Sequence, residues 1–155
     1  MAFSGTSLTF QPSDIRRLTP GDIFLTPPRA PNAAPEMHML LDPSPSKMPE
    51  YMRLSDFRVF RFTGTQWTVQ NLTSRCRMRL VGQPMAIDYN SGLIGRIILT
   101  DSGMGITAVR DDNNDNVWVD LSRYQVELFR PVLHLGFEGV LEFQDEQSCE
   151  WRELP

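Results

Sequence analysis

The sequence predicts a mainly β protein, a single-domain antiparallel β-sandwich or open barrel with a Pro-rich irregular N-terminal segment. Short runs of alternating apolar and polar residues recur along the chain, and no long stretch keeps convincing helical spacing. The 12 Pro and 10 Gly favour short elements joined by turns. With 155 residues, the chain has the size of one domain built around one core.

The chain divides into three expected regions. Residues 1–56 form a Pro-rich leader packed on the domain or on a partner, residues 57–143 form the β domain, and residues 144–155 form an acidic tail. A flexible linker is the alternative for the leader, but its apolar content favours packing. Strands are predicted within the leader at residues 7–10, at residues 22–26 after a Pro20-Gly21 turn, and at residues 37–41.

Residues 57–81 predict a three-strand antiparallel meander. Thr63-Gly64 and Thr73-Ser74 are its turns, so Phe60 faces Trp67 across the first of them. Gln83-Pro84 is expected to turn the chain after the meander. The period-two pleat gives the meander one apolar face, carrying Phe60, Phe62, Trp67, Val69, Cys76, Met78 and Leu80. The predicted core of the domain comprises Phe60, Phe62, Trp67, Val69, Met78, Leu80, Ile97 and Leu99.

A second meander is predicted by three apolar runs joined by turn-forming residues. The runs cover residues 93–100, 105–110 and 117–120, and the turns are Asp101-Ser102-Gly103 and the DDNNDN loop. The next stretch, residues 121–130, fits helical spacing as well as strand alternation, so both remain open. Two further strands are predicted at residues 132–135 and 137–143.

The polar face of the first meander carries four arginines, which predict an anion-binding or partner-binding surface because guanidinium offers paired donors to phosphate and carboxylate. They are Arg61, Arg75, Arg77 and Arg79. Residues 1–100 have a net charge of +4 and residues 101–155 a net charge of −8. This asymmetry favours docking to a charged partner or between copies over binding to nucleic acid. The alternative is a solvated face, or pairing within the chain to its acidic final third.

Other chemistry is weakly indicated. Asp111, Asn113 and Asp115 alternate as in a calcium loop, but Asn116 stands where that loop needs Gly, so an acidic hairpin tip is the expected structure. Cys76 and Cys149 belong to no metal-ligand motif, and neither a cofactor nor a metal is expected. The chain shows neither a secretory signal nor a stretch long enough to span a membrane, which favours a cytoplasmic protein or one assembled in a particle.

Three segments resemble the middle of forkhead-associated domains: RLSDFRVFR (53–61), WTVQNLTSR (67–75) and LVGQPM (80–85). The resemblance covers about a third of the chain and implies a β-sandwich that reads phosphothreonine from its loops. The family's Ser-x-x-His motif is here Ser55-Asp56-Phe57-Arg58. The site that the resemblance implies comprises Ser55, Arg58, Asn71, Ser74 and Gly82.

The sequence favours a protein that works by association and not by catalysis. His38 and His134 have no acidic partner in a recognisable motif, and no Ser lies in a nucleophile elbow. The expected function is therefore that of a non-enzymatic assembly component of a larger complex, such as a viral particle or a bacterial machine, acting through protein partners or self-association. The alternatives are a forkhead-associated-like phosphopeptide module and a small hydrolase or ligand-binding β-barrel.

Overall fold

The computed structural model describes residues 12–26, 31–33, 35–42, 49–62, 68–88, 93–100, 103–128, 134–145 and 147–153. The protein is mainly β, as the sequence predicts, and the strands within these described residues form one 13-stranded sheet. Two short 3-10 turns, η1 (Ile15–Arg17) and η2 (Thr73–Arg75), precede strands of the sheet. The strands are β1 (Pro12–Asp14), β2 (Ile23–Thr26), β3 (Glu36–Leu41), β4 (Glu50–Arg53), β5 (Arg58–Arg61), β6 (Thr68–Asn71), β7 (Cys76–Ile87), β8 (Arg96–Thr100), β9 (Gly103–Arg110), β10 (Asn116–Asp120), β11 (Gln125–Leu128), β12 (His134–Gln144) and β13 (Trp151–Glu153).

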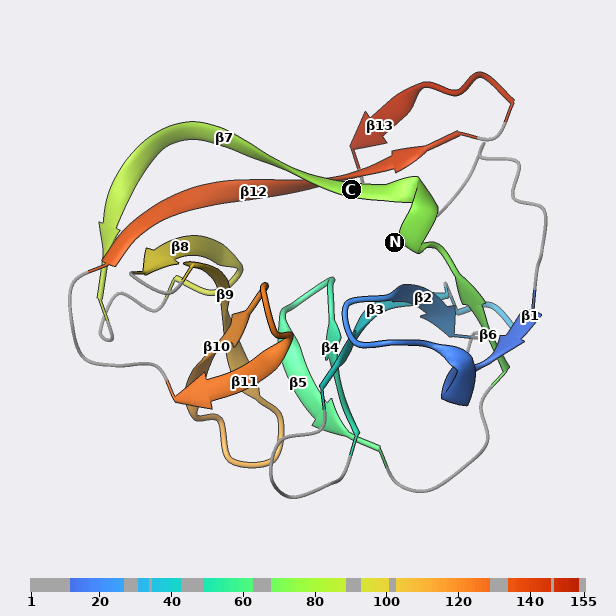
Figure 1. Cartoon of the computed structure of the whole chain (residues 1–155), viewed down its shortest axis with the longest axis horizontal. Helices are drawn as coiled ribbons and strands as arrows, with labels where there is room; N and C mark the ends of the chain where they lie inside the picture. Colours follow the sequence, from blue (N-terminus) through green and yellow to red (C-terminus); the bar gives the residue numbers. More distant parts are fainter. Residues whose placement is uncertain are drawn as a thin grey trace.

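Figure 1 shows two groups of strands beneath a long curved ribbon made by β7 and β12. One group contains β1 to β6 and the other contains β8 to β11. The groups are joined by a short parallel pairing of β5 with β9, in which Arg58 lies opposite Val109. The ribbon continues the second group, because β12 also pairs with β8.

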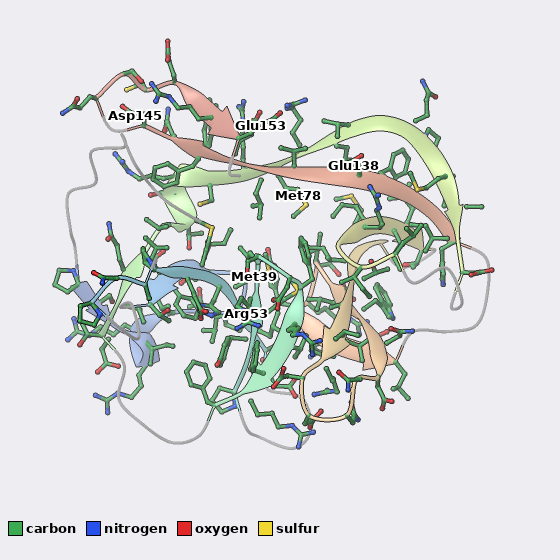
Figure 2. The ribbon with its side chains drawn as sticks, turned by 180° about the vertical axis from the view of Figure 1, so that it is seen from behind. Met39, Arg53, Met78, Glu138, Asp145 and Glu153 are labelled. Carbon is green, nitrogen blue, oxygen red and sulfur yellow. The ribbon has the colours of Figure 1, made fainter. Side chains whose placement is uncertain are left out.

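The main core collects buried side chains from both groups and from the ribbon. The first group contributes Leu25 and Met39, the second contributes Ile106 and Val117, and β12 contributes Phe143. Figure 2 shows Met78 of the ribbon pointing toward the body of the protein, where Met39 lies. The apolar faces of all three parts are therefore buried against each other, which is the main stabilising term expected for such a fold.

The second meander is confirmed. β8, β9 and β10 are successive antiparallel neighbours, with Ile106 opposite Ile97 on one side and Val119 on the other. These three side chains are almost completely buried. The turn-forming residues between the runs allow each strand to return beside the previous one, so the sequence pattern is enough to predict this part of the sheet.

The strand pairing predicted for the first meander is wrong. β5 pairs with β4 and β9, β6 pairs with β1 and β2, and β7 pairs with β12. Residues 63–67, with the predicted first turn and Trp67, lie outside the described residues, and residues 73–74 belong to η2. The alternation of apolar and polar residues determines which face of a strand is buried, but it is compatible with any neighbour of matching pattern.

The predicted leader contributes strands to the sheet itself. β2 and β3 coincide closely with two of the predicted strands, while residues 7–10 lie outside the described residues. Gly21 has a φ of +92°, as the predicted Pro20-Gly21 turn requires. The boundary expected at residue 56 falls inside the hairpin of β4 and β5, so the described part of residues 1–56 is not separate from the β domain.

The predicted core is only partly correct. Val69, Phe62 and Ile97 are buried, and Phe60 and Met78 are half-buried. Leu80 is 44% exposed and Leu99 is 37% exposed, so these two are not core residues. Both lie on the apolar face of their strands, but at positions that no other element covers completely.

The last third of the chain also differs from prediction. Residues 125–128 form a strand, β11, so the alternation and not the helical spacing describes this stretch. One strand, β12, stands in place of the two predicted at residues 132–135 and 137–143, and it has a register shift against β7 between Gly136 and Glu138. Residues 132–133 lie outside the described residues. The acidic tail adds β13, which pairs with the end of β12. β7 passes through Gln83-Pro84 without turning back.

Candidate interaction surface

Arg77 and Arg79 lie on the outer face of the ribbon and bind one carboxylate. Arg77 of β7 is opposite Glu142 of β12. Arg79 lies two residues further along β7 on the same face, so it is a diagonal neighbour of Glu142. The Nε of Arg77 donates to Glu142 at 2.6 Å, and the Nε of Arg79 donates to the other oxygen at 2.9 Å. These two hydrogen bonds lower the pKa of Glu142, because each stabilises the charged form.

The acidic tail completes this charged cluster. Arg79 also donates through Nη2 to Glu153 of β13 at 2.9 Å, and the guanidinium of Arg77 lies 4.1 Å above the ring of Trp151. Guanidinium groups bind favourably over aromatic faces, so Trp151 holds β13 against the ribbon. Arg77 and Arg79 are thus paired within the chain to its acidic third, which was the alternative to a partner-binding surface.

The four predicted arginines do not share one face. Arg61 is on β5, where its Nε lies 3.6 Å from Glu50, and Arg75 ends η2 before β7 begins. Only Arg77 and Arg79 lie together on a strand face. The prediction placed Arg61 beside them because it paired β5, β6 and β7 consecutively, and these strands have other neighbours.

The residues carried over from forkhead-associated domains lie in separate parts of the sheet. Ser55 and Arg58 are at the β4–β5 hairpin, whereas Asn71 ends β6 and Ser74 is in η2. The order β6-β2-β3-β4-β5 puts four strand steps between the two sets. At about 4.8 Å per step this is roughly 19 Å along the sheet. Gly82 lies on β7, which pairs with neither β5 nor β6.

The alternating Asp111, Asn113 and Asp115 form the tip of the β9–β10 hairpin. The side chain of Asn113 donates to Asp115 at 2.8 Å and accepts from the backbone N–H of Asp115 at 3.0 Å. Asp111 lies 3.4 Å from a guanidinium nitrogen of Arg58. Their polar atoms bind each other and a neighbouring arginine, as in an ordinary acidic turn.

Neither a metal cluster nor a membrane-spanning helix is found in the part of the chain that the structure describes. His38 is buried between the rings of Phe24 and Tyr51. This packing is that of a core aromatic residue.

The clearest exposed apolar feature crosses three neighbouring strands. Leu99 of β8 lies opposite Met104 of β9 on one side and opposite Leu135 of β12 on the other. Their exposed fractions are 37%, 44% and 48%. We call Leu99, Met104 and Leu135 the apolar row. Exposed Ala86 of β7, opposite Leu135, extends it by one strand.

The apolar row continues the face that lines the main core. Ile97 and Ile106 are opposite each other one step along the same face, and they are 1% and 0% exposed. On the same face, the side chain of Ile97 is therefore buried and that of Leu99 is partly exposed. Sequence reasoning did not distinguish the two positions, because both are apolar residues of the same strand in the same alternation. Leu99 is closer to the turn than Ile97.

β7 is an edge strand. Among the described residues it pairs with β12 and with no other strand. Pro84 lies within it, and Gly82 has a φ of +75° where the register against β12 shifts. Proline and bulges are typical of edges, because an edge residue has no second neighbour to which its N–H must donate. The six residues Cys76–Val81 before this irregularity are called the β7 edge segment.

The comparisons with family models, with curated proteins and with solved structures found no match to this chain. The apolar row and the β7 edge segment are therefore interpreted from their own geometry and chemistry.

The two cysteines are expected to differ strongly in reactivity. Burial raises the pKa of the Cys76 thiol to about 12, whereas Cys149 is exposed in the turn before β13. Since the thiolate is the reactive form, iodoacetamide at pH 8 should modify Cys149 at least about 100-fold faster than Cys76. Peptide mass spectrometry over time measures both rates, and the difference should disappear in urea. Equal rates in the folded protein would contradict the placement of Cys76.

Proposed function

We propose that the protein is a non-enzymatic interaction or assembly component of a larger complex and that the apolar row is a contact surface for a protein partner. The observation that carries this proposal is the in-register exposure of Leu99, Met104 and Leu135 on adjacent strands. Single exposed apolar residues are common on soluble proteins, but contiguous ones mark interaction surfaces. A sheet also holds its side chains in a fixed arrangement, so little ordering is lost when a partner binds.

The energetic contribution of such a contact is moderate. Complete burial of a Leu or Met side chain stabilises by about 1.5–3 kcal/mol, and roughly half of that remains available at the exposures found here. A partner that covers the row gains a buried apolar patch at the centre of the contact. The proposed contact does not depend on Arg77 and Arg79, because they lie on the outer face of the ribbon, where they contact Glu142 and Glu153, and not in the apolar row.

Replacement of Leu99 and Leu135 by serine is expected to abolish association without unfolding the protein. The test is the mass of the protein in solution, alone and mixed with the purified proteins encoded beside it, over a range of concentrations. Leu128→Ser is the matched control, because Leu128 is 72% exposed on β11 and lies outside the row. Its complexes should match those of the wild type.

Two outcomes would overturn the proposal. One is a wild-type protein that stays monomeric at every concentration and gains no partner. The other is a complex that survives Leu99→Ser together with Leu135→Ser as well as it survives Leu128→Ser.

A further inference from the structure

We propose that the β7 edge segment binds an extended strand of a protein partner in which apolar and acidic residues alternate. This inference rests on the proposed function, because it specifies how a partner is held. Along Cys76–Val81 the described strands leave one side of β7 unpaired, and an edge of this kind presents a row of backbone donors and acceptors. An added strand satisfies those groups with ladder hydrogen bonds.

The length of the partner strand is limited by the irregularity in β7. Pro84 has no N–H to donate, and Gly82 breaks the regular register with a left-handed backbone conformation. The regular part of the edge, Cys76–Val81, is six residues long. This length is typical of strands in globular proteins.

The side chains of the segment determine the partner's pattern. Cys76, Met78 and Leu80 lie on the face of β7 that lines the core. Leu80 is 44% exposed, so the core covers it only in part. Arg77 and Arg79 point to the other face, each with 47% of its side chain exposed. A strand beside β7 therefore lies next to apolar residues on one face and next to the two arginine side chains on the other, whose guanidiniums reach across β12 to Glu142 and Glu153.

The inner neighbour of β7 already shows this pattern. On β12, Leu141 lies opposite Met78, Glu142 opposite Arg77, and Phe143 opposite Cys76. A partner strand that repeats the alternation of β12 would place apolar residues beside Cys76 and Met78 and a carboxylate beside Arg77 on the outer side. Each guanidinium has five N–H donors, and the hydrogen bonds to Glu142 and Glu153 use one in Arg77 and two in Arg79. Both groups thus keep donors for a second carboxylate.

In the register centred on Met78, the charges disfavour a second copy of β7 as the occupant. Antiparallel pairing of two β7 strands about Met78 would place Arg77 of one copy opposite Arg79 of the other. Like charges directly opposite each other destabilise a strand pair. An acidic partner strand has the complementary charge, so it is the occupant to which we commit.

The probe is a capped hexapeptide, Leu-Glu-Val-Glu-Phe-Glu, and its control is Leu-Lys-Val-Lys-Phe-Lys. Titration into the isotopically labelled full-length protein, followed by amide chemical shifts, should show saturable changes at Cys76–Val81 with the Glu peptide. Its affinity should exceed that of the Lys peptide at least about tenfold, because the latter places ammonium groups against Arg77 and Arg79. Hydrogen exchange should slow on binding at the segment amides that point away from β12, because those that point toward β12 are already hydrogen-bonded.

Two substitutions test the site itself. Leu80→Asp puts a carboxylate on the apolar side of the edge and should weaken binding of the Glu peptide at least about tenfold, because an apolar side chain of the peptide would then lie beside a charge. Leu128→Asp introduces the same charge at an exposed position of β11 and should leave binding unchanged.

Several results would overturn the inference. These are equal binding of the two peptides, no shift changes at the segment, or protection in the free monomer of the segment amides that point away from β12, which would mean that the edge is covered. Protection that appears only in a self-associated state would assign the edge to a second copy. The variant with Leu99→Ser and Leu135→Ser should still bind the Glu peptide. Loss of the partner by that variant while the peptide fails to bind the wild type would refute this inference and leave the proposed function standing.

Discussion

Replacement of Phe143 by alanine is expected to lower the free energy of unfolding by about 3–5 kcal/mol, the range for truncation of a buried aromatic residue. Phe143 is 1% exposed and lies in the main core, where side chains of both strand groups and of the ribbon meet. Removal of the Phe143 ring would leave a cavity between the two strand groups and the ribbon. The surrounding side chains cannot fill this cavity unless a strand moves. Urea denaturation monitored by circular dichroism and tryptophan fluorescence measures the change.

Leu135→Ala is the control for Phe143→Ala. Leu135 lies on the same strand and face but is 48% exposed, so its truncation should cost less than about 1 kcal/mol. A loss below about 1 kcal/mol for Phe143→Ala, comparable with this surface change, would mean that β12 does not close the main core.

The choice of Phe143 illustrates what the sequence could predict about the fold. The alternation in residues 137–143 predicts a strand with Phe143 on an apolar face, and the turn-forming residues around it predict an antiparallel arrangement. No pattern in the neighbouring sequence indicates that this face packs against the core residues of β2, β3, β9 and β10. Pairing adjacent strands instead places Trp67 in the predicted core and omits Phe143, and Trp67 lies outside the described residues.

The candidate surface shows the same limit. Arg77 and Arg79 were correctly assigned to one face, because the period of two residues depends only on the strand itself. Their partner Glu142 is 65 residues from Arg77 and 63 from Arg79, so no local pattern connects them. The apolar row was missed because Leu99 and Ile97 occupy equivalent positions in the alternation of the same strand. Only the folded structure shows that the core covers Ile97 and does not extend over Leu99.

A buried ion pair gives the second large expected effect. Glu50 of β4 is 1% exposed, and its Oε1 accepts a hydrogen bond from Nη1 of Arg110 at 2.8 Å. Arg61 is farther away, with its Nε 3.6 Å from the same oxygen. The other carboxylate oxygen, Oε2, is buried and accepts no hydrogen bond among the described residues. Arg110 therefore provides the closest compensation for a charge that water does not reach.

Arg110→Met is expected to lower the free energy of unfolding by about 3–5 kcal/mol, because it leaves the Glu50 carboxylate buried without its closest partner. Arg61→Met should cost less than about 1 kcal/mol, since Arg61 is half-exposed and makes no short contact with Glu50. The double change Glu50→Leu with Arg110→Met removes both charges and should recover most of the loss, because an apolar pair of similar volume needs no compensation. Urea denaturation of the four proteins provides the comparison. A double variant no more stable than Arg110→Met alone would show that Arg110 acts through packing and not through the charge of Glu50.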